Sequence, residues 1–165
     1  MQVKFGSGTM TRVLPKDYAS QDCSIARALE VVGERWTLLV VREALLGARS
    51  FDDFEAGLGI PTNTLAKRLE LLVAHDILER SVDPEDGRRR TYRPTARGRQ
   101  LQLVVEALRE WGDRHLVDGR PPVSVIHREC GSDIELVARC ASCDRDIELT
   151  AGEVERVEHR PVRRP

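Results

Sequence analysis

The fold of this 165-residue chain is decided by residues 50–73, whose sequence is SFDDFEAGLGIPTNTLAKRLELLV. Ser50 is a suitable N-cap for a short helix over residues 51–58, and Thr62 or Asn63 opens a second helix after a turn rich in glycine and proline. The apolar residues of both helices recur at helical spacing and are Phe51, Phe54, Leu58, Leu65, Leu69, Leu72 and Val73. Two helices joined by a tight turn predict a helix-turn-helix.

Two further helices are predicted before this motif. Asp22 or Ser24 can cap a helix that ends at Gly33. The apolar side of that helix consists of Ile25, Ala28, Leu29 and Val32. The next helix, Arg35 to Leu46, is apolar on nearly every side and ends at Gly47, so we expect it to run through the centre of the core or of a dimer.

A β-hairpin and a long helix are predicted after the motif. Residues 77–82 and 91–93 are expected to be strands, because they flank the turn signal Asp-Pro-Glu-Asp-Gly at residues 83–87. Thr95 caps an amphipathic helix that runs to about Val117. Its apolar stripe consists of Leu101, Val104, Val105, Leu108, Trp111 and Leu116. Together these elements predict a mainly α fold with a small β wing, an α+β winged helix-turn-helix.

This arrangement predicts contacts with DNA. In a winged helix the second helix of the motif enters the major groove, where Asn pairs with adenine and Arg or Lys with guanine. Thr62 and Thr64 lie near the N-terminus of that helix and are better suited to phosphates. The candidate contacts on the motif, including those of the expected outward face of the second helix, are Ser50, Thr62, Asn63, Thr64, Lys67 and Arg68.

The wing is strongly basic. Residues 88–99 contain six arginines and no acidic residue. The candidate DNA contacts here are Arg88, Arg89 and Arg90, and we expect Arg89 and Arg90 at the hairpin edge to meet phosphates or the minor groove. The acidic residues at positions 83, 85 and 86 would weaken this attraction if they shared the same face. A leucine stripe or an arginine run alone more often indicates core or a solvated face, so the prediction rests on their order and spacing.

Three regions are expected along the chain. They are an N-terminal arm at residues 1–20, the winged helix-turn-helix domain for DNA binding and dimerisation at residues 21–118, and a small zinc-ribbon-like appendage at residues 123–160. The Asp-Gly-Arg-Pro-Pro sequence at residues 118–122 separates the last two. Short strands are expected in the appendage around Val123 and Val125, at residues 134–137 and at residues 146–149.

The appendage contains a Cys/His cluster with metal-ligand spacing. His127-x-x-Cys130 and Cys140-x-x-Cys143 can bring one imidazole and three thiolates to a tetrahedral zinc. Four protein ligands leave no open coordination position, so one structural zinc is predicted, and it would hold together a segment with few large apolar groups. Reduced cysteines without metal, or a different histidine as ligand, are the open alternatives. The alternative histidines are His115 and His159.

Several motifs resemble the HxlR-type winged helix regulators, in unbroken order over about residues 22–117. The matching motifs are DCSIARAL at 22–29, VGERWTLL at 32–39, RE at 42–43, FDDF at 51–54, LAKRL at 65–69, Tyr92, TARG at 95–98 and EWGDRH at 110–115. The sequence departs from the commoner pattern at Pro61, where many members have Ser, and at Pro94, where many have Leu. Because Pro94 cannot donate to a strand ladder, its strand should be short or lie at a sheet edge.

The resemblance implies a bacterial or archaeal transcription regulator that binds a pseudo-palindromic operator in double-stranded DNA as a homodimer. It places the dimer interface on the first helices and the long helix from Thr95, the recognition helix near Thr62, and the wing at residues 83–90. Many such regulators have a cysteine at the position of Cys23, and in some of them it senses electrophiles or oxidants. Cys23 is therefore a candidate redox sensor, with a small structural cysteine as the alternative. A small-molecule or redox effector is a candidate further partner.

Composition narrows the class of protein. The formal net charge is -1, with 26 basic and 27 acidic residues, and no apolar run approaches the ~18–20 residues that span a bilayer. The N-terminus lacks a secretory signal, and the four cysteines do not form a secreted disulfide framework. We therefore expect a cytoplasmic protein with no membrane partner.

The sequence does not predict an enzyme. No nucleophile–base pair, phosphate-binding glycine loop or paired-carboxylate site stands out. The main alternative to a regulator is a protein-interaction module that uses the winged helix as a scaffold and the zinc-knuckle appendage as a binding surface. A metal-dependent enzyme would require an open zinc position and a nearby acid or base.

Overall fold

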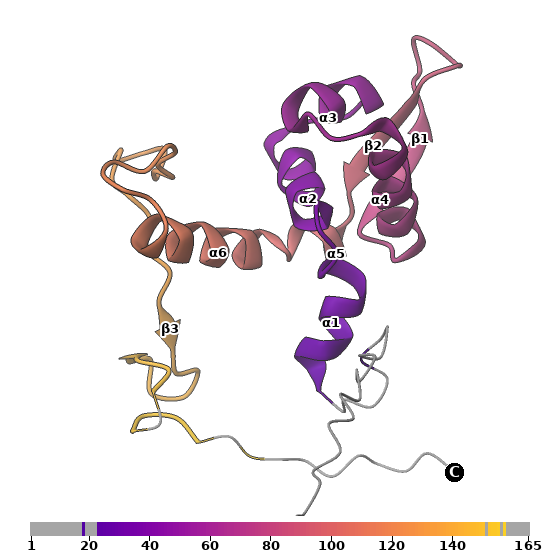
Figure 1. Ribbon diagram of the computed structural model, residues 1–165. Coiled ribbons are helices and arrows are strands. Elements are labelled where there is room, and N and C mark those ends of the chain that lie inside the picture. Colours follow the sequence, from indigo (N-terminus) through magenta and orange to yellow (C-terminus); the bar gives the residue numbers. More distant parts are fainter. Residues whose placement is uncertain (1–17, 19–22, 151, 156, 158–165) are drawn as a thin grey trace, which may run out of the picture. The chain divides into compact units, whose positions relative to one another are not determined.

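The computed structural model describes residues 18, 23–150, 152–155 and 157 (Figure 1). The predicted N-terminal arm, apart from Tyr18, lies outside the described residues, as do Asp22 and His159. No helix in the described ranges is both long enough and apolar enough to cross a membrane.

The chain divides into two units, Met1–Val105 and Glu106–Pro165. The first unit contains four helices, a two-stranded hairpin and a short fifth helix. These elements are α1 (Ser24–Val32), α2 (Thr37–Leu46), α3 (Phe51–Leu58), α4 (Thr62–Ala74), β1 (Leu78–Val82), β2 (Arg90–Pro94) and α5 (Ala96–Arg99). The mainly helical fold with a small antiparallel sheet is thereby confirmed.

One side of α2 lies in the core of the first unit, while Leu39 and Leu46 on the same helix are exposed. Figure 1 shows α2, α3, α4 and the hairpin gathered together, and their side chains form one buried cluster. The fully buried side chains of this cluster are Val40, Val41, Phe54, Leu65, Leu69, Leu72 and Leu78, with Thr37 beside them. The rings of Phe54 and Tyr92 on β2 form a T-shaped contact, with ring centroids 6.2 Å apart. The hairpin therefore shares the core of the helix-turn-helix.

The wing hairpin forms as predicted. β1 and β2 pair antiparallel, from Leu78 opposite Pro94 to Val82 opposite Arg90. On the other side of β2, the Tyr92 N–H donates to the Arg49 carbonyl over 2.8 Å, next to an isolated bridge between residues 50 and 91. The strand that contains Pro94 has five residues, in keeping with the expected short strand.

The first helix differs from the prediction in its cap and its buried side. Cys23 occupies the N-cap position with extended backbone, and its side chain makes no capping hydrogen bond. Ala26 and Val32 are buried, whereas Ile25 is 70% and Leu29 39% exposed. The predicted apolar side of this helix is therefore mostly exposed in the single chain. α2 likewise begins at Thr37 rather than Arg35, and it ends at Gly47 as expected.

The long helix expected from Thr95 is interrupted. α5 ends at Arg99, and a separate helix, α6 (Gln102–His115), follows the turn. The Thr95 hydroxyl accepts a hydrogen bond from the Gly98 N–H and donates to the Asp76 carbonyl over 2.6 Å, so α5 is fixed against the end of α4. Because Leu101 then packs against the core, the chain turns before α6 begins.

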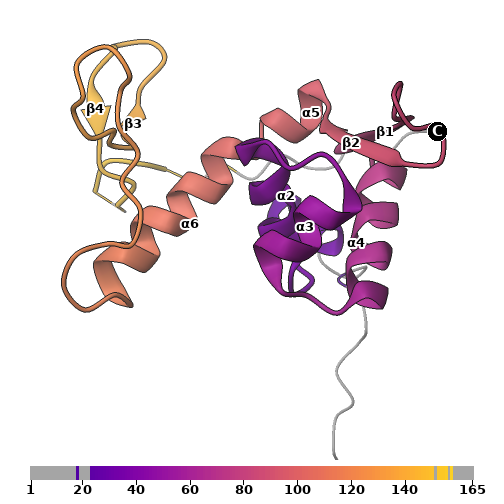
Figure 2. The ribbon, with the colours of Figure 1, turned by 90° about the horizontal axis from the view of Figure 1, so that it is seen from above.

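The second unit contains few regular elements. β3 (Ala138–Arg139) and β4 (Asp146–Ile147) pair antiparallel, and an isolated bridge joins Ile126 to Asp133 (Figure 2). The strand predicted at residues 146–149 is present in its first half. Residues 134–137 and the Val123 region are not strands, because only the residues next to the two cysteine turns pair across the chain.

Gly98 provides a test of how α5 is fixed. A Cβ atom at Gly98 would lie 2.1 Å from the Ile77 carbonyl oxygen, so Gly98→Ala must push α5 away from the core. We expect a loss of about 1–3 kcal/mol in the free energy of unfolding, measured by denaturant titration followed by circular dichroism. Gly112→Ala is the matched control, because no atom lies within 4 Å of its Cβ position and alanine favours helix. An equal loss in both variants would contradict this account.

Candidate nucleic-acid interface

The exposed face of α4 follows from its buried face. Leu65, Leu69 and Leu72 are buried in the core, so the opposite side of the helix, with Asn63 and Lys67, faces solvent. Thr62 is also exposed, and its hydroxyl donates to Glu55 Oε1 over 2.8 Å. This bond joins the start of α4 to α3 across the tight turn. Glu55 is a positioning residue that the sequence pattern does not reveal.

The N-terminus of α4 has no side-chain cap. Pro61 occupies the N-cap position, and no side chain accepts a hydrogen bond from the first turn. Ser50 and Thr95, by contrast, cap α3 and α5 with their hydroxyl oxygens. The first turn of α4 is therefore open to an external acceptor, which a phosphate can provide.

Arg68 lies elsewhere than the sequence pattern predicts. Its side chain is only 16% exposed, and its guanidinium lies 3.6 Å from the Glu34 carboxylate. Arg68 is one helical turn from both Leu65 and Leu72, which places it at the edge of the buried stripe. The prediction that Arg68 lies on the outward face of α4 is therefore wrong. Thr64 is half-buried, so Thr62, Asn63 and Lys67 are the predicted contacts of α4 that lie on its outward face.

The wing loop directs its acidic side chains onto its own backbone. Asp83 accepts from the Glu85 N–H over 2.9 Å, and Asp86 accepts from the Arg88 N–H over 3.0 Å. Such local Asx turns fix the loop conformation and satisfy part of the hydrogen-bonding capacity of each carboxylate. Arg88 and Arg90 are exposed, and neither forms an ion pair with another residue of the described part of the chain. Both remain available to an anionic partner.

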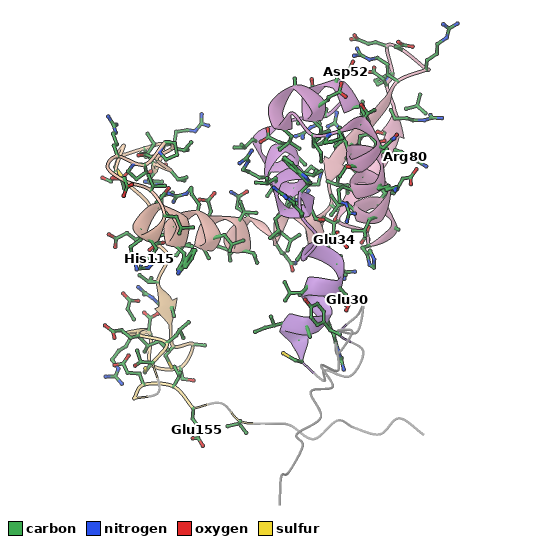
Figure 3. The ribbon with its side chains drawn as sticks, in the orientation of Figure 1. Glu30, Glu34, Asp52, Arg80, His115 and Glu155 are labelled. Atoms are coloured by element: carbon green, nitrogen blue, oxygen red, sulfur yellow. The ribbon has the colours of Figure 1, made fainter. Side chains whose placement is uncertain are left out.

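Arg89 has a different environment from its neighbours. Its guanidinium donates to Asp52 Oδ2 over 2.9 Å, which joins the wing to the first turn of α3 (Figure 3). Both side chains are more than half exposed, so we expect this ion pair to be weak. Asp52 was not predicted as part of the site, because its partner lies 37 residues away in the sequence.

Ser50 and Asp53 form a capping box at the start of α3. The Ser50 hydroxyl accepts from the Asp53 N–H, and the Asp53 carboxylate accepts from the Ser50 and Arg49 N–H groups over 2.8 and 2.9 Å. The Ser50 backbone N–H, followed by that of Arg49, holds the pKa of Asp53 below its ordinary value of 3.8. The predicted cap at Ser50 is confirmed. The half-buried Ser50 hydroxyl is used to cap α3, and its predicted contact with DNA stays a prediction.

The HxlR-like helix-turn-helix family matches residues 31–119, which is more than half of the chain. This chain belongs to the HxlR-like helix-turn-helix family. The resemblance seen in the sequence motifs is therefore confirmed, and the protein is a transcriptional regulator of HxlR type whose partner is DNA.

Relatives support the same assignment. The HTH-type transcriptional regulator Rv3095 of Mycobacterium tuberculosis is 41% identical over 125 residues, 75% of this chain and 79% of Rv3095. The HTH-type transcriptional regulator YodB of Bacillus subtilis is 30% identical over 93 residues, 56% of this chain and 83% of YodB. Among solved structures, that of PA1607 is 31% identical with a TM-score of 0.74, and the similarity covers 84% of this chain and 96% of PA1607.

The Cys/His cluster of this HxlR-like chain consists of two local pairs. His127 Nδ1 lies 3.3 Å from Cys130 Sγ, and Cys140 and Cys143 are at the same spacing in a second turn. No three His, Cys, Asp or Glu side chains of the described residues already converge as a metal group. The predicted zinc therefore stays a prediction. The His115 ring lies against the Trp111 ring of α6 in a tilted contact, with ring centroids 5.4 Å apart.

Hydrogen bonds perturb two of these thiols. The Ser132 hydroxyl and N–H, followed by His127, lower the pKa of Cys130 to about 7. Arg145 lowers the pKa of Cys143 in the same way, through its side chain and its backbone. Cys23 is exposed at the N-cap of α1, and its role as a redox sensor stays a prediction.

The capping box predicts a pH-dependent contribution to stability. Asp53→Asn removes the charged acceptor of two backbone N–H groups, and we expect a loss of about 0.5–1 kcal/mol at neutral pH, given the exposure of Asp53. Because the folded pKa of Asp53 is lowered, its stabilisation is full above the ordinary value of 3.8 and is lost as the pH falls through the folded value. Urea titrations at several pH values measure the difference from wild type.

Asp52→Asn is the control for this experiment. It removes a carboxylate from the same helical turn, where the helix dipole acts equally, but Asp52 accepts no backbone N–H of the cap. A loss of stability in Asp52→Asn as large and as pH-dependent as that in Asp53→Asn would show that general charge, rather than the capping box, is responsible.

Proposed function

We propose that this regulator binds a pseudo-palindromic operator as a homodimer, with α4 in the major groove and the wing on the DNA backbone. The observation that carries the proposal is the arrangement of one polar helix face and one basic hairpin on the same buried core. Asn63 and Lys67 project from α4, while Arg88 and Arg90 project from the wing. Asparagine and lysine suit base edges, and the arginines suit phosphates.

The N-terminal half of α4 is the part best suited to enter the groove. Its first turn lacks a side-chain cap, so its N–H groups can meet a phosphate at the groove edge. Glu70 lies two turns beyond Asn63 on the same exposed face, where a carboxylate would be repelled by phosphates. Insertion of the helix by its N-terminal end keeps Glu70 away from the DNA backbone.

The wing docks through Arg88 and Arg90, and Arg89 has a second role. Because the Arg89 guanidinium pairs with the Asp52 carboxylate, Arg89 connects the wing to α3. The pairing leaves less of the positive charge of Arg89 available to DNA. The acidic residues Asp83 and Asp86 are bonded to the loop backbone, which reduces their repulsion of phosphate. This division of roles revises the prediction from sequence, which preferred Arg89 and Arg90.

Exposed apolar stripes supply the dimer interface. On α6, Val104, Leu108 and Trp111 recur at one helical face, and Leu108 and Trp111 are more than half exposed. On α1, Ile25 and Leu29 are exposed as well. Stripes of this kind on a soluble chain indicate a protein interface, and a second copy of the chain is the partner that places two α4 helices on two half-sites. The half-sites should lie roughly 34 Å apart.

Two classes of variant should change DNA binding differently. Arg88→Ala combined with Arg90→Ala should weaken binding to all duplexes alike and reduce the salt slope by about two for each protomer, because two phosphate contacts are lost. Asn63→Ala should instead lower the preference for the operator by ~1–3 kcal/mol. Fluorescence anisotropy on the upstream DNA of the gene and on a scrambled duplex, across a salt series, measures both.

Asp52→Asn serves as the opposite control, because it releases Arg89 and removes one negative charge. Binding to both duplexes should then stay equal or tighten. If Asn63→Ala and the double arginine variant both leave operator binding unchanged, the docking described here is wrong.

The dimer interface on α6 is tested by a charge on its stripe. Leu108→Glu removes about 2 kcal/mol of apolar burial from each copy, so the dissociation constant of the dimer should rise about 1000-fold. Light scattering coupled to size-exclusion chromatography gives the oligomeric state over a concentration series. Gln100→Glu adds the same charge at an exposed position between α5 and α6 and should leave the dimer intact. A Leu108→Glu protein that remains fully dimeric at low concentration would exclude this interface.

A further inference from the structure

The turn at His127 has a defined hydrogen-bond pattern. The His127 N–H donates to the Ser132 carbonyl over 2.8 Å, and the Gly131 N–H donates back to the His127 carbonyl over 2.8 Å. Gly131 has a φ of 71°, a left-handed conformation that glycine adopts without strain. This closed turn places the side chains of His127 and Cys130 on the same side, with Nδ1 and Sγ 3.3 Å apart.

The turn at Cys140 repeats the same pattern. The Cys140 N–H donates to the Arg145 carbonyl over 2.9 Å, and the Asp144 N–H donates back to the Cys140 carbonyl over 3.0 Å. Asp144, which corresponds to Gly131, has a φ of 56° although it is not a glycine. A non-glycine residue in this region costs free energy, so its presence indicates that the turn requires the conformation. The Cys140 and Cys143 side chains thus occupy the same positions in their turn as His127 and Cys130 do in the first.

Both turns are supported in the same way by their flanks. The bridge between Ile126 and Asp133 closes the first turn, and β3 with β4 closes the second. The second unit therefore contains two copies of one device, a closed turn that presents two donor atoms at positions i and i+3. Bonds of about 2.0 Å to nitrogen and about 2.3 Å to sulfur in a tetrahedral zinc site separate those atoms by about 3.5 Å. The 3.3 Å between His127 and Cys130 is close to this separation.

The described residues of the second unit form no hydrophobic core that could hold the two turns together. No described residue after Gly98 is buried. Most of the large apolar side chains described in this unit are exposed, among them Val123, Ile126, Ile134, Val137 and Leu149, and the others, such as Leu136 and Ile147, are only half-buried. A segment of this size without a core requires a cross-link, a metal or a partner to be stable.

We propose that one Zn²⁺ ion joins the two turns through His127, Cys130, Cys140 and Cys143. Binding converts three thiols to thiolates and releases their three protons to the solvent, while the imidazole binds as a neutral donor. Four protein ligands complete the tetrahedron, so the ion is structural and has no position for substrate. The ion fixes the separation of the two turns, which their own hydrogen bonds leave undetermined.

Metal content of the full-length chain provides the first test. Purified reduced protein is incubated with zinc sulfate, desalted and measured by mass spectrometry of the metal. We expect one zinc per chain in the wild type and less than about a fifth of that in Cys140→Ser and Cys143→Ser. Cys23→Ser is the matched control, because Cys23 lies far from the cluster in sequence and should leave the zinc content unchanged. Equal zinc content in all four proteins, or no zinc in the wild type, would overturn the proposal.

The histidine ligand is tested by a matched pair. His127→Ala should lose most of the zinc, and His127→Cys should restore it, because thiolate is also a zinc ligand. His115→Ala should retain full zinc content, since the His115 ring packs against Trp111 on α6. If His115→Ala loses zinc and His127→Ala retains it, then His127 is not the histidine ligand and the proposed ligand set is wrong.

The coordination geometry can be measured on the wild type, so the test does not depend on variants that fold poorly. Co²⁺ added to the metal-free protein should give intense visible absorption from a tetrahedral site, with charge-transfer bands that correspond to three thiolates. Cys23→Ser should give the same spectrum. A weak six-coordinate spectrum, or a spectrum from fewer than three thiolates, would contradict the proposed ligand set.

Discussion

The burial of one face of α4 is the constraint on which the DNA-binding surface depends. Leu65, Leu69 and Leu72 are almost completely excluded from solvent, and burial of each leucine contributes about 1.5–3 kcal/mol. This stripe fixes the rotation of the helix about its own axis, so Asn63 and Lys67 must point outward. A rotation by one residue would expose a leucine and bury a charged group. Folding and recognition are thus set by opposite faces of the same thirteen-residue helix.

The wing is positioned by the same core rather than by its own strands. A two-stranded hairpin alone is marginally stable in water. Here the Tyr92 and Phe54 rings pack in a T-shaped contact, and the Tyr92 N–H donates to the Arg49 carbonyl, so β2 is held between β1 and the segment before α3. The capping box at Ser50 begins α3 at the next residue. The strands that carry the basic loop are therefore packed on the core. This packing fixes the orientation of the loop relative to α4.

Local sequence patterns predict most of the secondary structure of the first unit, because each pattern involves residues that are close together in the sequence. The leucine spacing, the cap at Ser50 and the Asp-Gly hairpin turn each depend on neighbouring residues alone. The features that escaped prediction depend on distant residues. Arg68 is drawn toward Glu34, Arg89 toward Asp52, and α5 is separated from α6 because Gly98 and Thr95 meet the backbone at residues 76–77. The hydrophobic periodicity of a single segment contains no information about such long-range contacts.

The two units differ in what determines their structure. In the first, apolar burial fixes the distances between elements, and hydrogen bonds adjust the ends of helices. In the second, hydrogen bonds close each cysteine turn, but no described residue is buried, so nothing in the packing sets the separation of the turns. Local hydrogen bonds act over a few ångströms and cannot supply that long-range restraint. A metal ion bound by the side chains of both turns would supply the missing restraint on their separation.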